Sequence, residues 1–307
     1  MASSAVAQTP TMLVLRAAPG KSADAAAPVP PLKKEDIAEI KIGGKPAEIT
    51  GFDPLLKGPH TLQLMIVMDS MQMLGSTDKF ADLKRFVDEM PSNVEIGVGW
   101  LLQSHVKVTQ PPTTDRALVD KVLIPQTREE AGNPKNDNGN PFSCLRDLAA
   151  HWPNADATKL RAVLVFTDGI IRSNAQSQAG DQESPDVDGA SQSLERAGII
   201  PYPFYWMDPP PPVDPNRSEG GPLEGQQNFS QLVKYSGGYP LFEGMFSPGS
   251  IGPLLDRLYT VLQSEAVVTV TAKGSPGKFT RLDVKATSDD MKIVGPDSVM
   301  IGNVWKK

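Results

Sequence analysis

Cysteine, histidine and long apolar segments are all scarce in this sequence. Its 307 residues include one cysteine, Cys144, which excludes an internal disulfide framework and a cysteine-based zinc cluster. We expect this thiol to be buried and inert, and not a reactive group at a helix N-terminus. No apolar run approaches the length of a membrane span. The three histidines lie apart along the chain, and we expect them at the surface or at sheet edges and not as metal ligands: His60, His105 and His151.

The charged residues do not indicate a nucleic-acid partner. The 36 acidic and 30 basic residues leave a net charge of −6 at pH 7, and no basic stripe runs along any segment. Two common enzyme signatures are also missing. The chain has no G-x-S-x-G nucleophile elbow, and Gly43-Gly44-Lys45 lacks the spacing of a phosphate-binding loop. These absences favour a protein without catalytic activity.

The N-terminal residues bear on the compartment in which the protein works. Ala5-Val6-Ala7 has the A-x-A pattern that signal peptidase cleaves, but no charged segment and no apolar segment precede it. Either the signal peptide has been removed from this chain, or the pattern arises by chance. We favour removal and therefore expect a secreted or periplasmic protein.

Two apolar segments in this sequence each lead to an aspartate. Residues Leu62–Met68 precede Asp69, and residues Leu160–Phe166 are followed by a threonine and Asp168. Short, continuous apolar runs are typical of central parallel strands that are covered on both faces. Ligand sites in such sheets lie beyond the carboxyl ends of the strands. We therefore expect the two carboxylates to meet in one crevice.

Helical and strand patterns alternate around these two segments. We expect helices over 77–90, from Thr114, over 141–152 and 186–197, from Asn228 and over 251–262. Further strands are expected at 94–101, 105–108, 199–206 and 239–242. The two ends of the chain show only β patterns. These are a strand at 11–16, a hairpin over 37–50, and strands at 266–271, 279–286 and 298–301.

We therefore predict an α/β fold with a doubly wound, mostly parallel sheet. A small antiparallel β-domain would be built from the N-terminal and C-terminal segments. The predicted limits are 1–60 for an N-terminal segment with β-strands and an Ala/Pro-rich linker, and 61–264 for the α/β domain. Residues 265–307 would supply C-terminal strands that pair with the N-terminal segment.

The middle of the chain resembles a von Willebrand factor type A domain, of the kind found in the VWFA-related secreted proteins of acidobacteria. The resemblance rests on the aspartate-ended first strand, the strand and hairpin after it, and the segment Phe166-Thr167-Asp168-Gly169. The stretch from Leu32 to Phe52 also resembles the segment that precedes the domain in that family. The resemblance implies a role in adhesion or protein binding. It also implies a metal-ion-dependent adhesion site made of a D-x-S-x-S loop, a threonine and a final aspartate.

Transferred by position, the resemblance implies a degenerate form of that site. Asp69 and Asp168 match the two aspartates, and Ser143 matches the threonine, but Met71 and Met73 stand at the serine positions. Mg²⁺ prefers hard oxygen ligands, and thioether sulfur is a soft, poor ligand for it. A Mg²⁺ ion held by the two aspartates and the serine is one alternative. A second is a structural remnant in which the aspartates form turns and the methionines pack in the core. A third is the binding of another metal, or of a ligand without a metal.

We expect a non-enzymatic, extracytoplasmic module that binds a protein or surface partner through the loops around Asp69, Ser143 and Asp168. The proline-rich loop at 208–226 is a second candidate contact region. One alternative is a self-assembling structural subunit, in which the strand at 11–16 pairs with another copy. Another is a phosphotransferase with Asp69 as nucleophile, but that mechanism requires a second acidic residue at the position of Met71.

Overall fold

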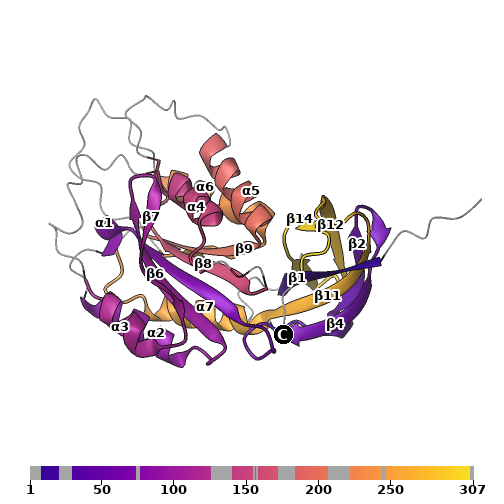
Figure 1. The fold of residues 1–307 in the computed structure, drawn as a ribbon, viewed down its shortest axis with the longest axis horizontal. Coiled ribbons are helices and arrows are strands. Elements are labelled where there is room, and N and C mark those ends of the chain that lie inside the picture. The colour runs from indigo at the N-terminus through magenta and orange to yellow at the C-terminus, as the bar shows by residue number, and fades with distance from the viewer. Residues whose placement is uncertain are drawn as a thin grey trace, which may run out of the picture.

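The computed structural model describes residues 8–20, 30–73, 77–125, 140–154, 156, 158–171, 184–206, 222–243 and 247–304. The sequence predictions for Ala5-Val6-Ala7, for most of the Ala/Pro-rich linker and for much of the proline-rich loop concern residues outside these ranges. Two parts lie side by side, an α/β part and an antiparallel β part (Figure 1). The chain is thus organised as a mixed α/β protein, as predicted.

A six-stranded sheet forms the centre of the α/β part. Its strands are β5 (Leu62–Met68), β6 (Val94–Leu102), β7 (His105–Thr113), β8 (Leu160–Phe166), β9 (Ile199–Tyr205) and β10 (Leu241–Phe242). The order across the sheet is β10-β9-β8-β5-β6-β7, and only β7 is antiparallel to its neighbour. Numbered within the sheet, this is the order 3-2-1-4-5-6 of doubly wound folds. The predicted mostly parallel sheet is therefore confirmed.

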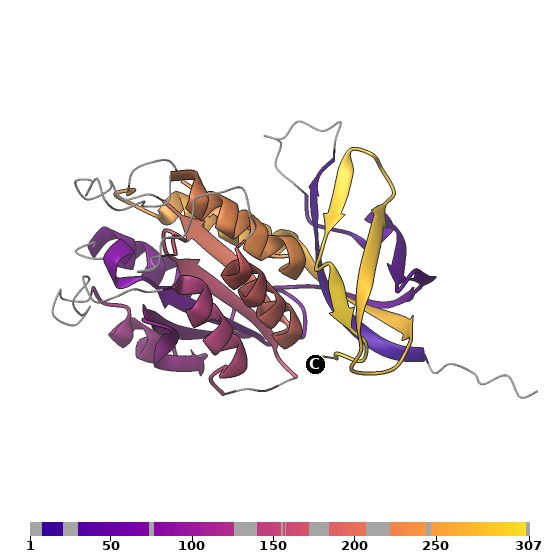
Figure 2. The ribbon, with the colours of Figure 1, turned by 90° about the horizontal axis from the view of Figure 1, so that it is seen from above.

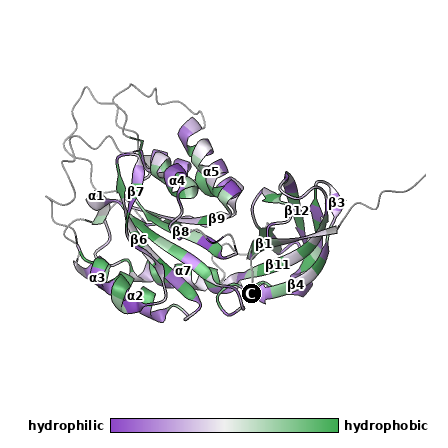
Figure 3. Cartoon of the chain, viewed as in Figure 1, coloured by the Kyte–Doolittle hydropathy of each residue, from purple (hydrophilic) through white to green (hydrophobic). Residues whose placement is uncertain are grey.

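Helices cover both faces of this sheet. They are α1 (Ser70–Met73), α2 (Thr77–Glu89), α3 (Arg116–Val122), α4 (Pro141–Ala150), α5 (Pro185–Ala197), α6 (Pro222–Ser236) and α7 (Gly252–Ser264). Along β5, Leu64 and Ile66 pack with α2, α3 and α7, whereas Met65 and Val67 pack with α4, α5 and α6. Alternate side chains of a strand point to opposite faces, so a strand buried on both must be apolar throughout. Figure 3 shows hydrophobic residues running along these central strands.

The start of α3 differs from the prediction by two residues. The side chain of Asp115 accepts hydrogen bonds from the backbone N–H groups of Ala117 and Leu118, so the helix begins at Arg116 and not at Thr114. Its buried face therefore contains Val119, and Leu118 is 39% exposed. A helix that began at Thr114 was expected to carry Leu118 among its apolar residues, and this expectation was wrong.

Eight strands form the second part of the molecule, in two four-stranded sheets. One sheet has the order β13-β1-β11-β4 and the other β14-β12-β2-β3. The strands are β1 (Gln8–Pro19), β2 (Ile37–Ile42), β3 (Lys45–Pro46), β4 (Glu48–Pro54), β11 (Glu265–Lys273), β12 (Phe279–Ala286), β13 (Met291–Val294) and β14 (Ser298–Met300). Apolar side chains of both sheets meet in one core.

Strands from the two ends of the chain pair with each other. β1 runs antiparallel to β11, from Gln8 opposite Lys273 to Arg16 opposite Glu265, and β2 pairs with β12. The N-terminal and C-terminal segments thus meet within one chain, as Figure 2 shows by the indigo and yellow strands. The domain limits given above remain predictions.

The expected hairpin over 37–50 is only partly present. β2 and β3 pair around Gly43 and Gly44, whose φ angles of 60° and 73° suit glycine. β4 leaves this sheet and pairs with β11 in the other one. This pairing covers β4 from Glu48 to Pro54, and β12 occupies the edge of β2 opposite β3. The strand β13 was not predicted.

Several backbone hydrogen bonds connect the two parts. The N–H of Leu32 bonds to the carbonyl of Ser264, the last residue of α7, at 3.1 Å, and the N–H of Asp297 bonds to the carbonyl of Tyr235 at 2.9 Å. Met12 and Val14 of β1 also join the core on one face of the α/β sheet. No helix within the described ranges combines the length and apolarity needed to cross a bilayer.

Candidate functional site

The strands β5 and β8 end side by side. They are in parallel register along their full length, with Met68 opposite Phe166 at the last pair. Asp69 and Thr167 are therefore the first residues beyond two adjacent strand ends. From here the chain connects β5 to β6 on one side of the sheet and β8 to β9 on the other, so this is the topological switch point. Open α/β sheets bind ligands at such points.

Asp69 is bound directly to the loop that follows β8. Its backbone N–H donates to the carbonyl of Phe166 at 2.8 Å, and its carboxylate accepts a hydrogen bond of 3.1 Å from the hydroxyl of Thr167. Thr167 is 2% exposed, whereas Asp69 is half-buried. The sequence analysis did not assign Thr167 to the site. The signal for it was a hydroxyl residue directly after the last residue of an apolar strand, next to Asp168.

Asp168 belongs to the turn that continues from Thr167. It is 5% exposed, and its Oδ1 accepts a hydrogen bond of 3.1 Å from the N–H of Ile170. Gly169 has a φ of 66°, and the amide of Asn228 on α6 donates to its carbonyl at 2.8 Å. Burial and then the charge of Asp168 raise the pKa of Tyr205, at the end of β9. α6 thus fixes this turn through Asn228, which was predicted only as the start of a helix.

Ser143 lies on a neighbouring helix and not in this hydrogen-bonded group. It is in the first turn of α4, where its N–H and that of Phe142 donate to the cap residue Asn140 at 3.2 and 3.0 Å. The Phe142 ring packs against Phe229 of α6, with centroids 6.2 Å apart. The first turn of α4 therefore reaches the same end of the sheet. Within the described residues, however, the hydrogen bonds join Asp69 to Thr167 and not to Ser143.

The two methionines that follow Asp69 help to decide whether the side chains of this site could bind a divalent cation. Met73 is 1% exposed and packs in the core of the α/β part; the side chain of Met71 lies outside the description. Mg²⁺ requires hard oxygen ligands, and a thioether held in the core cannot supply one. Thr167 already directs its hydroxyl proton at Asp69. Within the part of the chain that the structure describes, no three His, Cys, Asp or Glu residues gather as a metal cluster. This donor set does not fit Mg²⁺.

The remaining candidates have structural environments. Cys144 is 1% exposed, which confirms the expected burial, and its Sγ lies 3.6 Å from the carbonyl of Gln103. The expectation of a surface position was wrong for His60, which is fully buried and 3.3 Å from a carboxylate oxygen of Asp53. Residues 207–221 of the proline-rich loop lie outside the description, and residues 222–226 begin α6.

Comparison with known proteins gives similar structures but no relatives in sequence. No family profile and no curated protein matches the chain. Similar solved structures include the conserved hypothetical protein BatB from Bacteroides thetaiotaomicron. It is 13% identical, with 66% of this chain and 98% of that chain covered and a TM-score of 0.44.

Two further structures illustrate the range of these matches. The SpRpn10 VWA domain is 10% identical, with 64% of this chain and 95% of that chain covered and a TM-score of 0.42. The open conformation of the pilus adhesin SpaC from Lactobacillus rhamnosus GG is 9% identical, with 92% of this chain and 50% of that chain covered and a TM-score of 0.46. Structural similarity at these sequence identities and TM-scores does not assign a function to this chain.

Proposed function

We propose that this chain is a non-enzymatic, extracytoplasmic interaction module of the von Willebrand factor type A kind, with a degenerate adhesion site. The observation that carries the proposal is the position of Asp69, Thr167 and Asp168. They lie together beyond the ends of β5 and β8, at the switch point where open α/β sheets bind ligands.

The chemistry of these side chains favours binding over catalysis. A hydroxyl nucleophile needs an adjacent base that takes its proton, oriented in turn by a third group. Thr167 donates to Asp69, but the residue is 2% exposed, so its hydroxyl is not open to a substrate. An aspartyl nucleophile would want an acidic residue shortly after it, and Met71 and the buried Met73 follow Asp69. What remains is a half-buried carboxylate that can accept hydrogen bonds from a partner.

The rim formed by the loops around Asp69, Ser143 and Asp168 would contact a protein or surface partner. Without a coordinated ion, recognition depends on the shape of the loops and on hydrogen bonds to exposed polar atoms. The proline-rich loop predicted at 208–226 is a second candidate contact region on sequence grounds.

Self-assembly by strand addition is the alternative. The strand proposed for exchange, β1, pairs within its own chain with β11 over residues 8–16 and with β13 over residues 16–19. Exchange would require these pairs to open. The edge strand β7 contains Pro111 and Pro112, which have no N–H groups to donate to an added strand. These observations favour the interaction module over the assembling subunit.

The test uses the full chain and two single variants of it as bait. Each is incubated with an extracytoplasmic extract of the source organism, and the proteins that each one retains are compared. Asp69→Asn alters the rim, and Asp290→Asn alters an exposed carboxylate of the β part as a matched control. We expect a protein that wild type and Asp290→Asn retain and Asp69→Asn loses. Equal retention by all three would overturn the assignment of the rim. Light scattering that shows concentration-dependent oligomers, with no partner retained, would favour the assembling subunit.

A further inference from the structure

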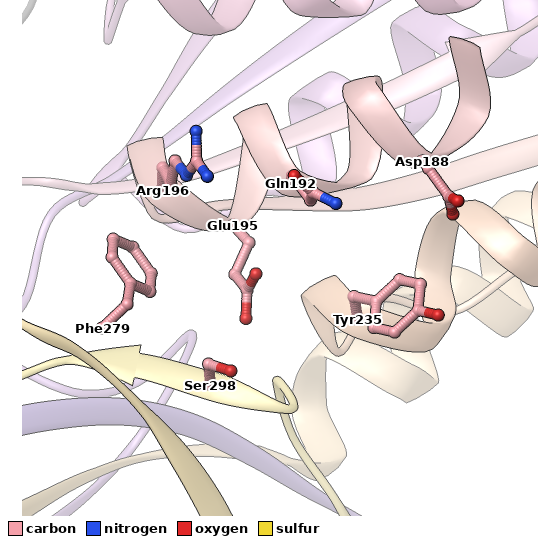
Figure 4. A pocket seen from close by; sticks show the side chains of 7 residues that line it. All are labelled: Asp188, Gln192, Glu195, Arg196, Tyr235, Phe279 and Ser298. Carbon is pink, nitrogen blue, oxygen red and sulfur yellow. The ribbon is translucent and has the colours of Figure 1, made fainter. Parts of the chain in front are cut away.

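A groove of about 290 Å³ lies where the α/β part meets the β part. Its walls come from α5, the end of α6, β12 and the start of β14 (Figure 4). α5 ends at Ala197, directly before β9 begins at Ile199, so the groove is near the amino ends of the sheet strands. The rim around Asp69 is at their carboxyl ends. The groove is therefore a separate site from the one described above.

The carboxylate of Glu195 points into this groove, toward Ser298 (Figure 4). Among the described residues its Oε1 is buried and has no hydrogen-bond partner. Burial raises the pKa of Glu195, as does the charge of Asp297, and the N–H and hydroxyl of Ser298 and the charge of Arg196 oppose that shift. A buried carboxylate oxygen without a donor is unfavourable, because it has lost its water without replacement. A ligand with N–H donors would relieve this.

Aromatic rings flank the carboxylate. Figure 4 shows Phe279 on one side of Glu195 and Tyr235 on the other, with the guanidinium of Arg196 directed away from the carboxylate. The ammonium of Lys234 already lies 5.1 Å from the centre of the Tyr235 ring, so one face of that ring is occupied by a cation. Phe279 is half-buried, and its own ring provides the second aromatic face in the groove.

A second carboxylate lies farther along the same face of α5. Asp188 is seven residues before Glu195, which is two helical turns, and both line the groove. It accepts a hydrogen bond of 2.7 Å from the side-chain amide of Gln231. The groove thus combines two carboxylates and one guanidinium, that of Arg196, with aromatic surface, and the excess of carboxylates over cations favours a cationic ligand.

We propose that this groove binds a guanidinium group, as carried by an arginine side chain. A guanidinium is planar and always charged, and it presents paired N–H donors that match a carboxylate. Its flat face stacks on an aromatic ring. Here Glu195 would accept the N–H donors, and Phe279 would cover one face of the group. An ammonium group carries the same charge as a guanidinium but is not planar, so it would bind more weakly.

The walls of the groove are held together before any ligand binds. The N–H of Asp297 donates to the carbonyl of Tyr235 at 2.9 Å, which ties the residue before β14 to the end of α6. A guanidinium bound here would contact both parts of the molecule at once. Because it would bind only the folded chain, it would raise the unfolding temperature.

The test is isothermal titration of the full chain with arginine amide, citrulline amide and lysine amide. Citrulline replaces the guanidinium by a neutral group of nearly the same shape. We expect saturable binding of arginine amide, and binding about tenfold or more weaker for the other two. No saturable binding of arginine amide, or equal binding of citrulline amide, would overturn the proposal. Equal binding of lysine amide would overturn the assignment of a guanidinium.

Three variants locate the site. Glu195→Gln and Phe279→Leu should each weaken the binding of arginine amide about tenfold, and Asp290→Asn, at an exposed carboxylate of the β part, should leave it unchanged. Unchanged binding by both groove variants would place the ligand elsewhere and overturn the proposal. Circular dichroism melting checks that each variant is folded; if Glu195→Gln is not, Phe279→Leu decides the question.

Discussion

The phenol of Tyr202 donates a hydrogen bond of 2.5 Å to the carboxylate of Glu265 and so connects the two parts of the molecule. Tyr202 is on β9 and fully buried; Glu265 begins β11 and is 2% exposed. Arg16 lies opposite Glu265 on β1 and bonds to the carbonyl of Gly238 at 3.3 Å. A polar cluster is thus enclosed where the α/β part meets the β part.

Tyr202→Phe should lower the free energy of unfolding by about 1–3 kcal/mol at pH 8. The change leaves the buried carboxylate of Glu265 without its phenol donor. Urea unfolding followed by circular dichroism measures the loss. The control is Tyr259→Phe, at a half-buried tyrosine whose hydroxyl has no hydrogen bond among the described residues. It should change stability by about 0.5 kcal/mol or less. Equal effects of the two variants would contradict the role of the Tyr202 bond.

Glu265 should make the stability depend on pH. Burial raises its pKa from 4.5 to about 7, against the opposing effects of Tyr202 and Arg16. Between these values the folded chain keeps the proton and the unfolded chain releases it, so stability falls as the pH rises. At about 1.4 kcal/mol per pKa unit, the loss from pH 4.5 to 8 is about 3 kcal/mol.

Glu265→Gln is the reference for this prediction, because a glutamine at that position does not titrate. The difference in unfolding free energy between wild type and the variant isolates the contribution of one group. We expect wild type to lose stability relative to Glu265→Gln as the pH rises from 4.5 to 7, with little further change above 8. A constant difference across that range would show that the pKa of Glu265 is not raised.

Thr167→Val should remove the hydrogen bond to Asp69 and lower the free energy of unfolding by about 1–2 kcal/mol. Thr167→Ser keeps the hydroxyl and is the matched control, with a smaller expected loss. In an Asp69→Ala background the effect of Thr167→Val should shrink, since its acceptor is gone. Chemical denaturation of the four chains completes the double-mutant cycle. Strict additivity would mean that the two side chains are not coupled.

Millimolar Mg²⁺ or Mn²⁺ should leave the unfolding temperature unchanged relative to EDTA. An ion that binds only the folded chain would raise that temperature as its concentration increases. We expect no rise because the first loop presents thioethers where a cation needs oxygen. Differential scanning fluorimetry with each ion makes the measurement. A concentration-dependent rise would show that a metal site is retained despite Met71 and Met73.

Met73→Ser would restore a hydroxyl but at a large loss of stability. The thioether is in the core, so its removal should lower the free energy of unfolding by about 2–4 kcal/mol. The size of this loss distinguishes a packed methionine from an exposed one at the loop surface. A change below about 0.5 kcal/mol, the usual effect of a surface substitution, would contradict the burial of Met73.

Much of the fold could be predicted from local patterns. The continuous apolar runs of β5 and β8 are buried on both faces, and the Asn140-Pro141 pair starts α4 as expected. These features depend on side-chain period and on capping chemistry, which act over a few residues. The departure of β4 from its hairpin could not be predicted in the same way. It depends on the pairing of β4 with β11, a strand from the far end of the chain.

The site was predictable only in part, for a related reason. Asp69 and Asp168 could be identified because each follows an apolar strand. The bond from Thr167 to Asp69 depends on the register between β5 and β8, and the support from Asn228 depends on where α6 packs. Neither the register nor the packing can be predicted from a local sequence pattern.

By itself the sequence determined most helices and strands, the class of the sheet and the absence of hard oxygen ligands at residues 71 and 73, because these follow from residue type and spacing. Only the tertiary structure decided which distant groups meet. Tyr202 and Glu265 are 63 residues apart, and Glu195 faces Ser298 across the junction of the two parts. Such contacts form because both parts must bury apolar surface against each other, and the polar groups at that boundary then find partners or, like Oε1 of Glu195, lack one.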